Sequence, residues 1–166
     1  MHNLRIVPLR FIDRLGELNW IEIELGLREG WLSSQSVIDI AIRRVVHGGN
    51  DPNEIELAGL LTNEQVYVTE ILSKLTLSEI NNSSLVPRIT WFRILMAWLY
   101  ENKNAIEDPL SVIEQMYADF GYPIEIRHLV RYNETPRAFD SRITAQKQVE
   151  DDWAEYVRNI SLRARV

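Results

Sequence analysis

Three histidines, His2, His47 and His128, are the first candidates for acid–base or metal chemistry in this 166-residue sequence. No two of them are four residues apart, the spacing that places two imidazoles on one helical face to bind zinc. His47 comes directly before Gly48, where a cation interacts favourably with the C-terminus of a helix. We therefore expect His47 to cap a helix and His128, which has arginines nearby in sequence, to lie on the surface.

Pairs of carboxylates could act as a general acid and base, but the pairs in this sequence have simpler explanations. Glu22 and Glu24 lie two residues apart and would diverge on a helix. Asp51 and Asp108 each precede a proline, the arrangement of a helix N-cap followed by the first helical residue. The "EDDW" stretch, residues 150–153, could offer two oxygen ligands, although a solvated acidic turn is its ordinary form. These pairs predict helix caps and surface side chains.

The sequence also lacks the motifs of several enzyme classes. It has no cysteine, which excludes disulfides, cysteine-ligated zinc and cysteine nucleophiles. Its seven glycines are scattered and form no phosphate-binding loop, and there is no G-x-S-x-G. We expect no catalytic residue, no metal site and no cofactor. An enzyme remains a lesser alternative, and it would need a pocket that holds Asp119, His128 and a carboxylate with a strongly shifted pKa.

Tyrosines that stand beside carboxylates form the best candidate for a binding surface. This composition is common at protein interfaces, although a tyrosine with a buried ring and a solvated hydroxyl is the alternative at each position. The predicted partner-binding residues are Tyr100, Glu101, Glu114, Asp119, Tyr122 and Glu125. We expect charge reversal at Glu114 and Asp119 to weaken binding without unfolding the protein.

Several of these residues belong to a stretch, 107–123, that has clear start and stop signals for one helix. Asp108 can cap the helix, Pro109 can begin it and Gly121 can end it. The residues expected on its inner face are Leu110, Ile113, Met116, Tyr117 and Phe120.

Helical periodicity recurs along the rest of the chain, and strand signals are scarce. Further helices are predicted within residues 19–33, 33–49, 51–61, 62–75, 89–100, 123–132 and 142–160. Thr62 and Gln65 have the spacing of a capping box. Residues 89–100 are apolar almost all round, which is typical of a buried central helix.

The predicted fold is all-α, with antiparallel helical hairpins stacked into a single bundle or a short HEAT-like array. The chain length favours one domain over residues 1–166. Residues 76–88 are polar and rich in turn formers, so we expect an internal loop there between two helical halves. The N-terminal segment, residues 1–17, is the one part that could be extended.

Net charge is −6, and residues 48–126 hold twelve Asp and Glu against four Lys and Arg, a local net charge of −8. An acidic middle argues against binding a nucleic-acid backbone. It is compatible with a basic protein partner, and equally with a surface kept charged for solubility. The N-terminus has no long apolar run, and no stretch approaches a membrane span. We therefore expect a cytoplasmic protein that binds neither membrane nor nucleic acid.

Three stretches together carry a resemblance to a known family: "NWIEIELGLREGWLS", "AWLYENKNAIEDPLSVIEQMYADFGYPIEIRHLVRYN" and "DDWAEYV". The sequence resembles a bacterial domain-of-unknown-function family of small, mostly helical proteins, some of which are proposed as immunity proteins of polymorphic toxin systems. The resemblance covers residues 19–157, and "ENKNAIEDPLSVIEQMYADFGYP" is its most specific part.

The resemblance implies a protein that neutralises a toxin by binding it, without catalysis, and it brings no catalytic residues. The expected partner is a protein, such as a basic toxin domain. The alternative from another functional class is a helical adaptor or regulatory scaffold. The oligomeric state stays open.

Overall fold

The computed structural model of the chain describes residues 6–80, 86–130 and 142–160, with the side chains of the last segment from residue 147. In these segments every regular element is a helix. The α-helices are α1 (Leu9–Leu15), α2 (Trp20–Arg28), α3 (Ser34–Val46), α4 (Pro52–Ala58), α5 (Val68–Glu79), α6 (Pro87–Glu101), α7 (Pro109–Asp119) and α8 (Arg142–Arg158). Short 3-10 helices are η1 (Thr62–Tyr67), η3 (Lys103–Ala105) and η4 (Ile124–Leu129). The predicted all-α fold is confirmed.

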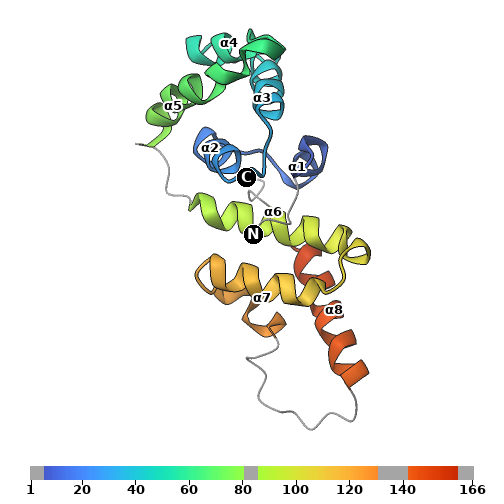
Figure 1. Ribbon diagram of the computed structural model, residues 1–166. Coiled ribbons are helices and arrows are strands. Elements are labelled where there is room, and N and C mark those ends of the chain that lie inside the picture. The colour runs from blue at the N-terminus through green and yellow to red at the C-terminus, as the bar shows by residue number, and fades with distance from the viewer. Residues whose placement is uncertain (1–5, 81–85, 131–141, 161–166) are drawn as a thin grey trace.

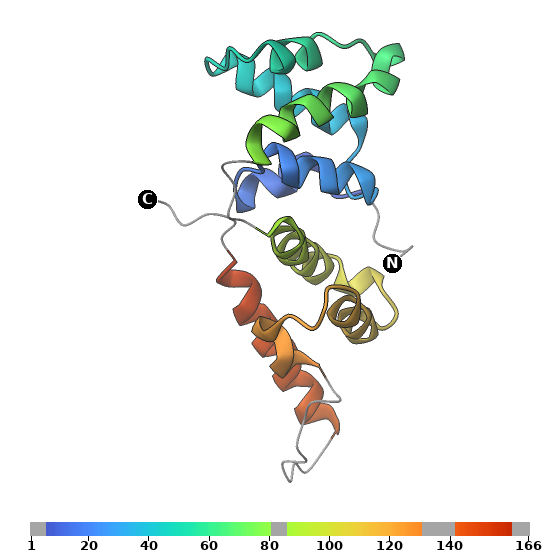
Figure 2. The ribbon, with the colours of Figure 1, turned by 90° about the vertical axis from the view of Figure 1, so that its left-hand side faces the viewer.

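The helices form an elongated stack of layers (Figures 1 and 2). At one end, α3 packs against α4, and α5 packs against both α4 and α2. The next layer holds α1 and α2, which pack against α6. On its other side α6 contacts α7 and α8, which form the opposite end of the stack. Helix α6 is thus the layer that joins the two halves.

The apolar residues of α6 are buried, as predicted for a central helix. Trp91, Phe92 and Leu95 are all fully inaccessible to solvent, and burial of each side chain contributes about 1.5–3 kcal/mol. The ring of Trp31 packs on both Trp91 and Phe120, with centroids 5.3 and 5.8 Å apart. This row of rings connects the end of α2, the middle of α6 and the end of α7.

Helices α2 and α6 cross closely because Gly26 faces the Trp91 indole without a side chain. The crossing also contains two buried hydrogen bonds. Trp91 Nε1 donates to the main-chain oxygen of Glu22 at 2.6 Å, and Thr90 Oγ1 donates to the Glu22 carboxylate at 2.6 Å. Glu22 is 2% exposed, and its carboxylate accepts hydrogen bonds from Thr90 Oγ1 and from the Asn19 N–H, as a buried polar group requires.

The predicted helix ends at Asp51, His47, Asp108 and Gly121 are confirmed. Asp51 accepts from the Asn53 N–H at 2.8 Å, and Asp108 accepts from the Ser111 N–H at 3.1 Å. His47 is the C-cap of α3, with Nδ1 2.7 Å from the Arg43 main-chain oxygen. Gly121 follows α7 with φ +80°, a left-handed conformation that favours glycine.

The expectation of an extended N-terminal segment is wrong for Leu9–Leu15, which form α1. Phe11 and Ile12 are buried against the core, and burial of this one face stabilises so short a helix. Residues 6–8 precede the helix, and the Val7 N–H donates to the Trp31 main-chain oxygen at 2.9 Å.

Part of the predicted loop at residues 76–88 is also helical, because α5 continues to Glu79 and α6 begins at Pro87. Leu75 and Thr76 are buried, and Thr76 Oγ1 donates to the Leu72 main-chain oxygen at 2.8 Å. The polar composition of this stretch therefore led to the prediction of a loop, although its first residues continue α5. The buried Thr76 hydroxyl is compatible with the helix because it donates to a main-chain oxygen of the same helix. Residues 81–85 lie outside the described segments.

The predicted capping box of Thr62 and Gln65 is wrong. Residues 62–67 form η1, and the Glu64 carboxylate accepts from the Leu61 N–H at 2.9 Å. Residues 124–129 form the 3-10 helix η4 in place of the α-helix predicted within residues 123–132. Residues 131 and 132 of that prediction lie outside the described segments. The last predicted helix is confirmed as α8.

Candidate partner-binding surface

Helix α7 presents one face to the core and the opposite face to solvent. Leu110, Ile113 and Met116 are buried on its inner face, as the sequence pattern predicted. The capping carboxylate of Asp108 fixes its first turn, and Gly121 ends it. The outer face is therefore held on a helix with defined ends, so its side chains are displayed in a fixed arrangement.

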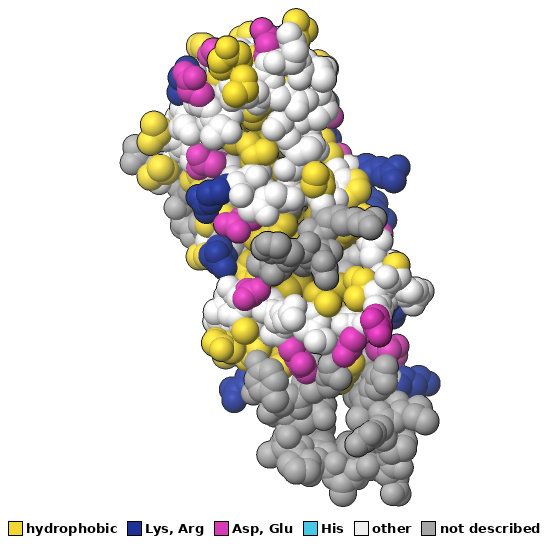
Figure 3. All heavy atoms as spheres, in the orientation of Figure 1, with side chains coloured by type: hydrophobic (Ala, Val, Ile, Leu, Met, Phe, Trp, Pro, Cys, Tyr) yellow, Lys and Arg dark blue, Asp and Glu magenta, His cyan; other side chains and the backbone are white. Residues whose placement is uncertain are grey.

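The surface around α7 is acidic. Five carboxylates and no lysine or arginine occur between Lys103 and Arg127. Among these acidic residues, Glu107, Asp108 and Asp119 are exposed, and Glu114 is partly exposed. We call these four residues the acidic α7 surface. Figure 3 shows acidic side chains gathered over the layer that contains α7.

The C-terminal end of α7 brings together two of the predicted binding residues, Asp119 and Tyr122. Tyr122 is 61% exposed, and its ring packs edge-on against Tyr117 at 5.2 Å between centroids. Its φ of +60° is unusual for a residue with a bulky side chain. The Tyr122 N–H donates to the Tyr117 main-chain oxygen at 2.8 Å, which holds the exposed ring at this corner.

A cation borders this corner of the acidic α7 surface. Arg88 donates to the main-chain oxygen of Asp119 at 2.8 Å, and its guanidinium lies 5.1 Å from the centre of the Phe120 ring. The side-chain carboxylate of Asp119 forms no ion pair with another described residue, and neither does that of Glu107. These two carboxylates can therefore meet an external cation without breaking an internal pair.

Glu125 has an internal role that the sequence did not indicate. Its carboxylate pairs with Arg93 of α6, with Oε2 3.0 Å from Nη2, and it accepts from the Tyr156 hydroxyl of α8 at 3.2 Å. Burial, followed by the nearby Glu125 charge, raises the pKa of Tyr156 well above its ordinary value of 10.0. Glu125 therefore joins η4 to two helices and is only half-exposed.

Tyr100 and Glu101 lie at the C-terminal end of α6, away from Asp119 and Tyr122. Because α6 and α7 run in opposite directions (Figure 1), their C-termini are at opposite ends of this pair of helices. The Tyr100 ring contacts the Trp153 ring at 5.1 Å, and Glu101 forms an exposed ion pair with Arg14 of α1 at 2.8 Å. The six predicted residues therefore occupy several sites around one hairpin.

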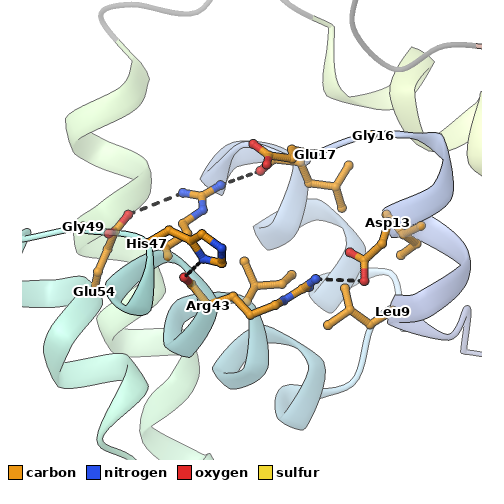
Figure 4. Close-up of a pocket in the computed structure, with 12 residues that line it drawn as sticks. Leu9, Asp13, Gly16, Glu17, Arg43, His47, Gly49 and Glu54 are labelled. Atoms are coloured by element: carbon orange, nitrogen blue, oxygen red, sulfur yellow. Dashed lines mark hydrogen bonds and ion pairs between the residues drawn. The ribbon is translucent and has the colours of Figure 1, made fainter.

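A pocket of about 440 Å³ lies elsewhere, between α1, the end of α3 and the start of α4 (Figure 4). Ile12, Leu18 and Ile40 give it an apolar floor. Sequence reasoning missed this pocket because its residues are distributed over 46 positions of the chain, from Leu9 to Glu54. Each of them alone resembles an ordinary surface or core residue.

Ion pairs and a hydrogen bond to a main-chain oxygen occupy both arginines of the pocket. Arg43 pairs with Asp13 at 2.8 Å. Arg44 donates to the Leu18 main-chain oxygen at 2.5 Å and lies 3.4 Å from the Glu54 carboxylate. The pocket contains neither Asp119 nor His128, so it does not assemble the group of residues that an enzyme was expected to need.

Within residues 6–80, 86–130 and 142–160, no group of three or more His, Asp or Glu side chains has an arrangement that could hold a metal ion. None of the helices in the same segments is long and apolar enough to cross a lipid bilayer.

One comparison with known proteins gives a match. A family model described as "uncharacterized protein conserved in bacteria (DUF2247)" matches residues 9–161. This confirms the resemblance to a bacterial domain-of-unknown-function family and extends it at both ends beyond residues 19–157. No curated protein and no solved structure matches the chain.

Proposed function

The chain belongs to the bacterial family DUF2247, and from this premise we propose that it is a non-enzymatic protein-binding module. More specifically, we propose an immunity protein that neutralises a cognate bacterial toxin by direct binding. The proposal combines the resemblance carried by residues 101–123 with the acidic α7 surface, which those residues form.

The acidic α7 surface is the observation that carries the proposal. Two of its four carboxylates lie on α7, which has a buried inner face, and the other two belong to the cap and the residue before it. Two of the four, Glu107 and Asp119, have no ion pair with a described residue. A toxin that acts on nucleic acid is typically basic where it binds phosphate groups. Carboxylates fixed on a rigid helix can occupy such a site, and complementary charge also accelerates association.

Co-purification with the product of the adjacent gene tests the proposal directly. We expect a stable complex whose association rate falls steeply as the salt concentration rises, because salt screens long-range attraction between exposed charges. A large secreted toxin encoded immediately beside this chain would agree with the same proposal. If the adjacent gene product shows no binding at low salt, the immunity proposal is wrong for this protein.

Charge reversal locates the binding surface. The double variant Glu107→Lys, Asp119→Lys should weaken toxin binding mainly by slowing association, with about 1–3 kcal/mol lost if both carboxylates face cations in the complex. The control for a charge reversal away from this surface is Glu56→Lys, an exposed position on α4 at the other end of the stack. Circular dichroism should show unchanged helicity in both proteins.

Two results would contradict this location of the surface. One is equal weakening by the α4 control, which would indicate a general charge effect. The other is loss of helicity in the double variant, which would make the α7 carboxylates structural. Capture of an unrelated partner at α7 would favour the adaptor alternative.

A further inference from the structure

The pocket between α1, α3 and the start of α4 combines an apolar floor with a rim that carries an excess of carboxylates (Figure 4). We propose that it is a binding site for one lysine or arginine side chain of a partner protein. This site is separate from the acidic α7 surface, so the proposal stands or fails without the function proposed above.

The floor of the pocket suits the aliphatic stem of a basic residue. Ile12, Leu18 and Ile40 are 1%, 4% and 8% exposed, and half-buried Leu9 continues the same apolar wall. Long cationic side chains cover apolar surface with their methylene groups and keep the charged head in a polar environment. The volume of about 440 Å³ lies within the range of small-ligand pockets, about 300–1,000 Å³.

The charge of the lining favours a cation. Three carboxylates, those of Asp13, Glu17 and Glu54, face two guanidinium groups. Both guanidinium groups already have partners: Arg43 pairs with Asp13, and Arg44 contacts Glu54 and a main-chain oxygen. Arg44 also lies over the Trp20 ring, 4.2 Å from its centre, which fixes the guanidinium against the protein.

Glu17 is the carboxylate that remains available. It is exposed at the rim, and it forms no hydrogen bond or ion pair with another described residue. The pocket also receives the C-terminus of α3, a helix of 13 residues that ends at Val46 with His47 as its cap. The carbonyl end of a helix carries a partial negative charge that favours a cation. Both Glu17 and the C-terminal end of α3 therefore favour the binding of a cation in the pocket.

Titration of the full chain with Nα-acetyl-lysine methylamide, followed by ¹H–¹⁵N NMR, tests the site. We expect saturable shifts at the amides of Gly16, Glu17, His47 and Gly49. The norleucine analogue, which has the same stem without the ammonium group, should give much smaller shifts. Absence of saturable shifts, or equal shifts with norleucine, would overturn the proposal.

Variants assign the effect to the pocket. Glu17→Gln should weaken binding of the lysine probe by about threefold to fivefold, as expected for one partly exposed ion pair. Glu56→Gln, an exposed position outside the pocket lining, should bind the probe like the wild type. Equal binding by Glu17→Gln, or stronger shifts at the acidic α7 surface, would contradict the site. Saturable binding of spermidine without binding of the lysine probe would contradict the proposal and would indicate a site for a free polyamine.

Discussion

At the scale of single residues, Gly26 allows α2 and α6 to cross closely. A Cβ at this position would lie 2.6 Å from Cε2 of Trp91, far inside van der Waals contact. The indole cannot easily move, because it is fully buried and its Nε1 donates to the Glu22 main-chain oxygen. Gly26 is thus required for space at the centre of the molecule.

Gly26→Ala should lower the free energy of unfolding by about 1–3 kcal/mol, the usual effect of overpacking a core. Urea denaturation followed by circular dichroism measures this change. Gly59→Ala is the matched control, since Gly59 has φ −83° and its nearest atom to a new Cβ is 3.5 Å away. A loss at Gly26 no larger than that at Gly59 would contradict the close crossing.

Tyr156 makes the stability of the folded protein depend on pH in the alkaline range. Its pKa is raised in the folded state, first by burial and then by Glu125. The unfolded chain therefore loses this proton near pH 10, before the folded protein does, and the linked stability is present below pH 10 and lost as the pH rises above it. We expect the urea midpoint of the wild type to fall more between pH 9 and 11 than that of Tyr156→Phe. Parallel curves for the two proteins would contradict the burial of this hydroxyl beside a carboxylate.

Local roles of single residues could be predicted from the sequence, whereas roles that depend on distant partners could not. His47 and Asp108 cap helices through main-chain groups within four residues of themselves, so their neighbours in sequence reveal them. Glu125 and Glu22 bind partners 32 and 68 residues away. No local pattern distinguishes such a glutamate from one on the surface.

At the scale of helices, α2 receives a cap from another helix. The Glu79 carboxylate, at the end of α5, accepts from the N–H groups of Trp20 and Ile21 at 2.7 and 3.2 Å. Asn19 and Glu22 complete the same helix start as a capping box. This contact also explains why α5 extends into the predicted loop, since Glu79 reaches α2 only if the last turn of α5 is formed.

Glu79→Ala should reduce the free energy of unfolding by about 0.5–2 kcal/mol, the usual cost of losing an N-terminal cap. Chemical denaturation measures it, with Glu70→Ala on the same helix as the control. Glu70 is exposed and lies 3.8 Å from Lys74, and a surface pair of this kind contributes at most about 1 kcal/mol. If both variants lose the same stability, Glu79 does not act as a cap.

At the scale of the whole molecule, the sequence pattern does not determine the order in which the layers of helices pack. Periodicity predicted most helices and their buried faces, because an amphipathic stripe is a local property. It does not say which stripe packs against which, since any two apolar faces can associate. The buried hydrogen bonds between Glu22 of α2 and its partners on α6 are specific, and they fix the two halves in one register.

The two halves of the molecule should unfold cooperatively, because they are joined through α6. Helix α6 has apolar neighbours on both sides, so the N-terminal and C-terminal halves share one core and should unfold together. The tryptophans report on both halves: Trp20 and Trp31 belong to the first, and Trp153 to the second. Their fluorescence and the helical circular dichroism should therefore change at the same urea concentration.

Thr90→Val tests the register directly, because it removes the hydroxyl that donates to the buried Glu22 carboxylate and keeps the shape of the side chain. We expect a loss of about 1–3 kcal/mol in the free energy of unfolding, the cost of leaving a buried carboxylate acceptor less satisfied. The fluorescence and circular dichroism transitions should still coincide. Thr69→Val, an exposed threonine on α5, should change stability little. Two separate transitions in the wild type would mean that each half holds its own core, and that α6 does not join them.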